Sequence, residues 1–162
     1  MRQLKYQEQK LLKKVDFLQW RNEDNLRVIE ILRRYHIQNR EDYTMYNKLC
    51  GQIKKLANQL MQLDPRDQYR IDTTQKILEK LYNMGIIPTK SNLAQCESLT
   101  ASAFCRRRLP VVLVRMKYAE TIKDAVTFVE QGHIRVGPEV ITDPAFLVTR
   151  YFHFHRITIF FL

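Results

Sequence analysis

The first ninety residues of the chain carry apolar side chains at helical spacing in four successive segments. Apolar residues that recur every three or four positions line one face of a helix, so each segment predicts one helix. The stripes are, in order, Leu11, Leu12, Val15 and Leu18; Leu26, Ile29, Leu32 and Tyr35; Tyr46, Leu49, Ile53, Leu56, Leu60 and Leu63; and Ile77, Leu78 and Leu81. Residues 1–90 are therefore expected to form a helical N-terminal region.

Capping and breaking residues give the expected ends of these helices. Asp42 is a candidate N-cap of the third helix, and Asp64-Pro65 is expected to end it. The fourth helix is expected to run from about Asp72 to a stop at Gly85. The third stripe resembles a heptad pattern but is too short for a free-standing coiled coil. It is either internal packing or a face that binds a protein partner.

The helical pattern loosens between residues 86 and 103, where Pro88 and several Ser and Thr residues occur. We interpret residues 91–105 as a joint that leads to a compact module over residues 106–150. In that module Pro110 fits the first turn of a helix, because its missing N–H group costs nothing there. Thr121 is expected to cap a second helix, which Gly132 ends in a left-handed conformation.

Beyond Gly132 the period of the pattern changes from helical to twofold. Ile134 and Val136 are expected to point to one side of a strand, and His133 and Arg135 to the other. Gly137-Pro138 then predicts a turn before a short return strand. The sequence thus predicts an α+β fold, in which a helical region precedes two helices packed on a short β-hairpin.

The charge of the chain indicates what kind of partner it has. The sequence contains 27 Lys and Arg residues against 17 Asp and Glu residues, a formal net charge of +10. Such an excess favours phosphate polyanions or acidic surfaces. Residues 98–118 contain five basic residues and no acidic one. Arg106, Arg107 and Arg108 are either part of an RNA-binding face or simply a solvated helix start.

Several classes of protein do not fit the sequence. No run of apolar residues is long enough for a membrane span, and the N-terminus lacks the pattern of a secretory signal. Cys50, Cys96 and Cys105 have neither disulfide nor zinc spacing, so reduced thiols are expected. His153 and His155 lack a third ligand nearby. Nucleophile elbows, metalloprotease motifs and phosphate loops do not occur. We therefore expect no enzyme activity, no cofactor and no metal.

The module resembles the S4 RNA-binding domain, which is named after a small-subunit ribosomal protein. The resemblance lies in the order of five segments: RRL, a helix ending in Arg-Met, a Thr-capped helix with Asp-Ala-Val, Gly-His-Ile-Arg-Val, and Pro-Ala-Phe-Leu-Val. The longer chain narrows the resemblance to nucleolar relatives of that protein, the core proteins of the U3 small nucleolar ribonucleoprotein. It extends from about Leu4 to Arg150 and includes LKYQEQKLLKKVDFLQW, LRRYHIQNREDYTMYNKL, LDPRDQYR and LTASAFCRRRLP.

This resemblance implies an RNA-binding factor for small-subunit ribosome assembly in the nucleolus. It implies binding to U3 small nucleolar RNA and promotion of its pairing with pre-ribosomal RNA, towards 18S rRNA. The implied protein partners are M-phase phosphoprotein ten and other proteins of the small-subunit processome. Matched by position, and with Lys117 added from the edge of the same helix, the candidate RNA-binding residues are Arg106, Arg107, Arg108, Arg115, Lys117, Thr121, His133 and Arg135.

The chain departs from the family pattern in two places. The hairpin turn carries Glu139 where many members have Asn-Gly or a basic pair, so this turn is not expected to touch phosphate. Residues 151–162 form an atypical apolar tail where the family continues with a polar, acidic segment. The tail either leaves an apolar surface or forms a strand. Two other functions stay open: a structural protein of the mature small subunit, and a basic protein–protein adaptor. His133 in turn either faces RNA or only bonds a neighbour.

Overall fold

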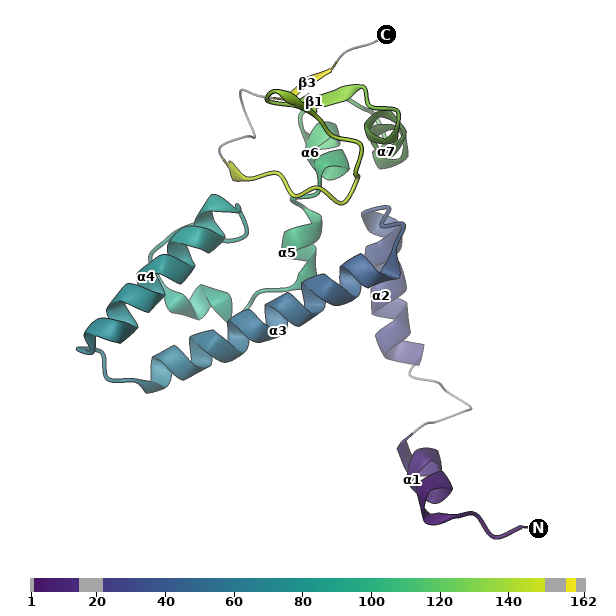
Figure 1. The fold of residues 1–162 in the computed structure, drawn as a ribbon, viewed down its shortest axis with the longest axis vertical. Coiled ribbons are helices and arrows are strands. Elements are labelled where there is room, and N and C mark those ends of the chain that lie inside the picture. Colours follow the sequence, from purple (N-terminus) through teal and green to yellow (C-terminus); the bar gives the residue numbers. More distant parts are fainter. Residues whose placement is uncertain (1, 15–21, 151–156, 160–162) are drawn as a thin grey trace.

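A computed structural model of the chain describes residues 2–14, 22–150 and 157–159 (Figure 1). Its helices precede a small antiparallel sheet, so the expected α+β class is confirmed. The helices are α1 (Tyr6–Lys14), α2 (Asn22–Arg34), α3 (Arg40–Gln62), α4 (Gln68–Asn83), the 3-10 helix η1 (Leu93–Cys96), α5 (Ala101–Cys105), α6 (Leu109–Arg115) and α7 (Ile122–Glu130). The strands are β1 (Ile134–Val136), β2 (Glu139–Val140) and β3 (Ile157–Ile159).

The helical region is built around the long helix α3, which crosses the middle of the molecule (Figure 1). Its core joins buried residues of α3 and α4 to buried residues of η1 and α5. Leu93, Cys96 and Phe104 belong to this core, and the ring of Phe104 stacks on Tyr46 with a centroid distance of 5.6 Å. Residues 91–105, expected as a joint, therefore pack as part of the helical region.

Two helix starts differ from the sequence-based expectation. Asp42 does not cap α3, because the helix already begins at Arg40 with Asn39 at the N-cap position. Helix α4 begins before Asp72, because the carboxylate of Asp67 accepts a hydrogen bond from the amide of Tyr69 at 3.0 Å. The predicted stop is confirmed: Gly85 has φ of 74° and its amide bonds to the carbonyl oxygen of Tyr82.

The heptad-like stripe on α3 divides between the core and the solvent. Tyr46 and Leu60 are buried in the core. Leu49, Leu56 and Leu63 remain 37%, 41% and 39% exposed. The stripe is thus internal packing on one side and leaves an open apolar face on the other.

The C-terminal module has its own core beneath α6, α7 and β1, at the top of Figure 1. Ile134 and Val136 are buried while Arg135 between them is exposed, which confirms the predicted alternation. The strand order is β2-β1-β3, and β1 pairs antiparallel with both neighbours. The described part of the apolar tail, Ile157–Ile159, therefore forms a strand.

The two ends of the module pair with each other. The amide of Leu109 donates to the carbonyl oxygen of Phe146, and the amide of Val148 donates to that of Arg107, each at 2.8 Å. Arg108 and Leu147 form the antiparallel bridge between these bonds. This short ladder holds the entry and the exit of the module side by side.

The structure bears on two of the excluded classes. Within residues 2–14, 22–150 and 157–159, no helix has the length and apolar character of a membrane span. Over the same ranges no three His, Cys, Asp or Glu side chains gather as metal ligands. His153 and His155, as well as Val15 and Leu18 of the first predicted stripe, lie outside the described residues.

Candidate nucleic-acid interface

The arginine run at the start of the module separates into one exposed and two buried side chains. Arg106 is exposed, whereas Arg107 and Arg108 are only 7% and 3% exposed. The expectation that all three face the solvent is therefore wrong for Arg107 and Arg108. The run lies where α5 of the helical region meets α6 of the module, so its middle and last members are enclosed between the two cores.

Arg107 bonds to the last segment of its own module. Its Nε and one terminal nitrogen donate to the carbonyl oxygen of Val148, at 2.9 and 2.6 Å. The same side chain packs against Gly85, where an added Cβ would lie 2.9 Å from Nε of Arg107. Burial lowers the pKa of the Arg107 guanidinium, and the positive charges of Arg115 and Arg150 lower it further. Arg107 is thus a structural cation that lies close to two others.

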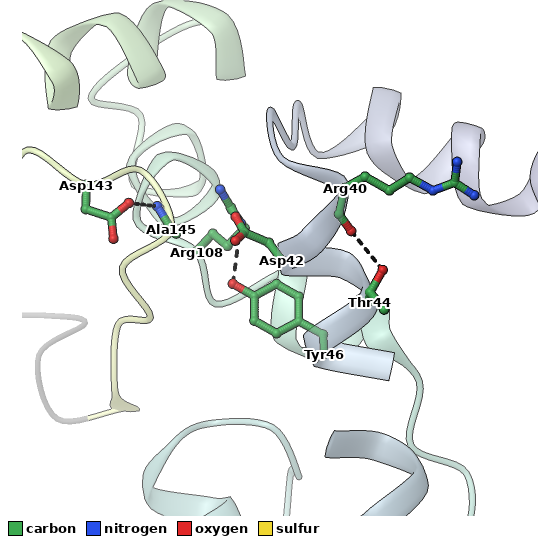
Figure 2. A network of polar contacts seen from close by, with 7 residues as sticks. All are labelled: Arg40, Asp42, Thr44, Tyr46, Arg108, Asp143 and Ala145. Carbon is green, nitrogen blue, oxygen red and sulfur yellow. Dashed lines mark hydrogen bonds and ion pairs between the residues drawn. The ribbon is translucent and has the colours of Figure 1, made fainter. Parts of the chain in front are cut away.

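Arg108 connects the module to α3 (Figure 2). One terminal nitrogen donates to a carboxylate oxygen of Asp42 at 2.8 Å and to the hydroxyl of Tyr46 at 3.3 Å. Burial is the main cause that raises the pKa of Tyr46, and the charge and hydrogen bond of Arg108 act against it. Because its donors bond to Asp42 and Tyr46, Arg108 holds the module against α3.

Arg115 is the last residue of α6. It is exposed, as expected of a residue that binds RNA. It is close enough to Arg107 to affect the pKa of that residue. Among the described residues, neither Arg115 nor Arg107 nor Arg150 forms an ion pair with a carboxylate. The positive charge of this group is therefore not compensated within the described part of the protein, and it attracts external anions.

Lys117 and Thr121 lie in the turn between α6 and α7. Lys117 is exposed and adopts a left-handed backbone, φ 63°, and its amide bonds to the carbonyl oxygen of Val114. The hydroxyl of Thr121 caps α7 as predicted, since it accepts from the amide of Asp124 at 3.2 Å. The same hydroxyl donates to the Asp124 carboxylate at 2.6 Å. Thr121 therefore has a structural task of its own, and a contact with RNA stays a prediction.

His133 and Arg135 belong to the hairpin side of the module. The imidazole Nε2 of His133 is 3.1 Å from the side-chain oxygen of Gln131, and its ring meets Phe128 edge-on. His133 thus does bond a neighbour, while its buried Nδ1 has no hydrogen-bond partner among the residues that the structure describes. Arg135 is exposed. A role of either residue in binding RNA stays a prediction.

The structure adds Arg150, which sequence reasoning missed. Its guanidinium lies over the ring of Tyr82, with Cζ 3.9 Å from the ring centroid, and one terminal nitrogen donates to the carbonyl oxygen of Ile87 at 3.2 Å. Nothing near residue 150 in the sequence points to Tyr82, because that residue belongs to α4. The cations of the module that are exposed or partly exposed, and so available to phosphate, are Arg106, Arg115, Lys117, Arg135 and Arg150. Guanidinium groups suit phosphate because they offer two parallel donors.

A fold of this kind, with two helices on a small antiparallel sheet and a cationic surface, defines an S4-type RNA-binding protein. Residues 107–150 match the family model described as the S4 domain, and residues 3–106 match the Ribosomal protein S4/S9 N-terminal domain. The two models divide the chain between Arg106 and Arg107, the point at which the second core begins.

Whole-chain relatives narrow this class. The chain is 57% identical to the U3 small nucleolar ribonucleoprotein protein IMP3 of Saccharomyces cerevisiae and 54% identical to that of Homo sapiens. Each match covers 93% of this chain and 82% of the relative. The small ribosomal subunit protein uS4 of Hyperthermus butylicus is 28% identical, over 81% of this chain and 73% of the relative. The chain belongs to the IMP3 family of U3 small nucleolar ribonucleoprotein proteins, which confirms the resemblance seen in the sequence.

Proposed function

We propose that the protein is a non-catalytic RNA-binding assembly factor of the U3 particle. It binds U3 small nucleolar RNA, promotes its pairing with pre-ribosomal RNA on the way to 18S rRNA, and acts in the nucleolus. M-phase phosphoprotein ten and other processome proteins are its proposed partners. The observation that carries this proposal is an uncompensated cationic group in the module of a chain that is 57% identical to a U3 particle protein.

The proposed mechanism follows from the charge of the exposed side chains. Two RNA strands repel each other through their phosphates, and a basic surface that screens this repulsion favours their annealing. The exposed guanidinium groups of Arg106, Arg115 and Arg135 contact phosphates without reading bases. Recognition by shape and phosphate also suits the double-helical RNA that pairing produces, since its deep major groove excludes side chains.

Binding to a U3 RNA fragment as a function of salt tests the proposal. Contacts to about four phosphates of single-stranded RNA give a log–log slope of roughly −3. Arg115→Gln is expected to make that slope shallower by roughly 0.7, the share of one phosphate. Arg27→Gln is the matched control, because Arg27 is also exposed but lies on α2. Equal effects of the two variants would count against a specific surface on the module.

Annealing is tested separately from binding. A labelled U3 fragment and its complementary pre-ribosomal strand are mixed with and without the protein, and the rate of duplex formation is followed by fluorescence. We expect faster pairing with the wild type than with Arg115→Gln. Tight binding without any acceleration would leave an RNA-binding protein but remove the pairing role.

A structural role in the mature small subunit is the second candidate, favoured by the 28% identity to uS4. Sedimentation of cell extracts separates the two, since stable co-migration with mature 40S particles would overturn the assembly-factor proposal. The adaptor hypothesis draws on the exposed apolar side chains Leu49, Leu56 and Leu63. Loss of protein partners in Arg115→Glu with unchanged affinity for RNA would favour the adaptor.

A further inference from the structure

Arg150 lies where the module meets the helical region. It follows the segment that closes the module, yet its guanidinium contacts the helical region at Tyr82 and at Ile87. The ring of Tyr82 belongs to α4, and the carbonyl of Ile87 belongs to the connection that follows this helix. The side chain is thus held from two sides in one orientation, although the residue remains partly exposed.

Two further cations lie beside this position. Lys90 lies over the same Tyr82 ring, with Nζ 4.9 Å from the centroid. Its ion pair with Glu79 is 3.8 Å long, and both side chains are about half exposed, so water screens it strongly. On the other side, Arg150 is close enough to the buried Arg107 to affect the pKa of that residue. Positive side chains of both parts, Arg107 and Arg150 of the module and Lys90 of the helical region, therefore lie at the seam, the boundary between the two cores.

The donors of Arg150 are only partly used by the protein. A guanidinium carries five N–H donors, and the carbonyl of Ile87 takes one of them. No carboxylate pairs with Arg150 among the described residues. A cation that is already oriented on an aromatic ring loses little conformational entropy when it binds an anion.

We propose that Arg150, seated on Tyr82 and assisted by Lys90, binds a phosphate of RNA and so extends the RNA path from the module onto α4. This inference rests on the proposed function and names a second part of the same surface. RNA bound along it would contact both cores at once. The phosphate backbone fits because its charges repeat along the strand, and Arg150 and Lys90 offer two cations on one aromatic ring.

The test uses the full chain and two lengths of single-stranded U3 RNA, one long enough to cover only the module and one several nucleotides longer. Arg150→Gln removes the charge, and Lys90→Gln does so without touching the contacts of Arg150 to the protein. For each variant we expect about fivefold weaker binding of the longer RNA and a salt slope shallower by roughly 0.7. The shorter RNA is expected to bind nearly as tightly as it does to the wild type.

Two controls separate a binding role from a structural one. Arg150→Lys keeps the charge, so the salt slope is expected to stay close to that of the wild type, with a modest loss of affinity because Lys cannot offer a fork of donors. Arg27→Gln removes an exposed charge on α2, which lies on the other side of the molecule from α4 (Figure 1), and is expected to leave both quantities nearly unchanged. Thermal melting of each variant shows whether the fold is intact, and Lys90→Gln keeps the test valid if Arg150→Gln lowers the melting temperature.

The outcomes distinguish this inference from the proposed function. If Arg115→Gln weakens binding while Arg150→Gln and Lys90→Gln behave like Arg27→Gln, the extension onto α4 is wrong and the RNA-binding function stands. If the wild type does not bind RNA more tightly than the Arg115→Gln variant does, the proposed function fails and the extension fails with it. Equal losses for the short and the long RNA would also overturn the extension, because the contact would then lie within the module's own path.

Discussion

Arg108 and Asp42 form an ion pair of 2.8 Å although they are 66 residues apart in the chain. The arginine side chain is 4% exposed and the aspartate side chain 17% exposed, so the pair is nearly withdrawn from water. It is a direct charged contact between the S4-type module and α3 (Figure 2). Breaking it leaves a guanidinium buried without its counter-charge.

Asp42→Ala is therefore expected to destabilise the protein by about 3 kcal/mol, the lower end for a broken buried pair. The double variant Asp42→Ala with Arg108→Met is expected to recover much of that loss, because replacing both charges leaves none unpaired. Urea denaturation of the single and double variants measures the coupling energy between the two positions. Losses that simply add would show that the pair does not act as a unit.

Gly85 supplies a second prediction, because both its backbone and its surroundings exclude a side chain. Gly85 has φ of 74°, and an added Cβ would lie 2.9 Å from Arg107 Nε. Gly137 has φ of 66° but nothing within 4 Å of an added Cβ. Gly137→Ala is expected to cost about 1 kcal/mol from backbone strain alone. Gly85→Ala is expected to cost at least about 1 kcal/mol more, since the buried Arg107 must move.

Thermal or chemical denaturation of the two alanine variants, side by side, isolates the contact with Arg107. The strain is common to both, so the difference between them reports the displacement of the guanidinium. Equal costs would mean that Arg107 moves aside freely and that its two bonds to Val148 contribute little.

Lys117 offers a stabilising substitution. It holds a left-handed backbone, φ 63°, directly after α6, where a non-glycine residue is strained by about 1 to 2 kcal/mol. Lys117→Gly is expected to stabilise the protein by about 0.5 to 1 kcal/mol, after the greater flexibility of glycine in the unfolded chain is subtracted. Lys117→Ala removes the charge but keeps the strain, so its melting temperature is expected to stay near that of the wild type. A glycine variant that melts no higher than the alanine variant would contradict this assignment.

The buried thiol of Cys105 makes stability depend on alkaline pH. Burial raises the pKa of Cys105 from 9.0 to about 11, with nearby Arg108 acting in the opposite direction. The unfolded chain thus loses the thiol proton near pH 9 while the folded chain keeps it until about pH 11. Ionisation then favours the unfolded state, so stability is full below pH 9 and falls by about 2 to 3 kcal/mol on the way to pH 11.

Denaturation at pH 8 and at pH 10.5 measures this fall. Cys105→Ala provides the control, since it removes the titrating group. The loss of stability is expected to be smaller in this variant. What remains comes from other buried groups such as Cys50 and Cys96, whose pKa values burial also raises. An identical fall in both proteins would assign the pH dependence elsewhere.

The features that the sequence predicted correctly depend on neighbours in the chain. Thr121 caps α7 through an amide three residues away, and Gly85 ends α4 through bonds within the same turn. The alternation of Ile134, Arg135 and Val136 likewise needs only the twofold period of a strand. Local signals of this kind are fully contained in the sequence.

The errors arose where a side chain depends on a distant partner. Arg107 and Arg108 look like solvated cations in the sequence, but the carbonyl of Val148 and the carboxylate of Asp42 lie 41 and 66 residues away. Only folding brings these acceptors close to the arginines, and the spacing of residues along the sequence does not predict such long-range contacts. Arg150 was missed for the same reason, because the aromatic ring that it contacts belongs to Tyr82 on α4.

The short ladder between residues 107–109 and 146–148 has a consequence for how such modules spread among proteins. Because residues 107–109 pair with residues 146–148, the segment between them begins and ends at adjacent positions, and β3 joins its sheet from a later part of the chain. A unit with neighbouring termini can be grafted into an unrelated chain with little disturbance of either part. The adaptations specific to this host are then few: the acidic acceptor on α3, the glycine after α4 and the aromatic ring that receives the last arginine.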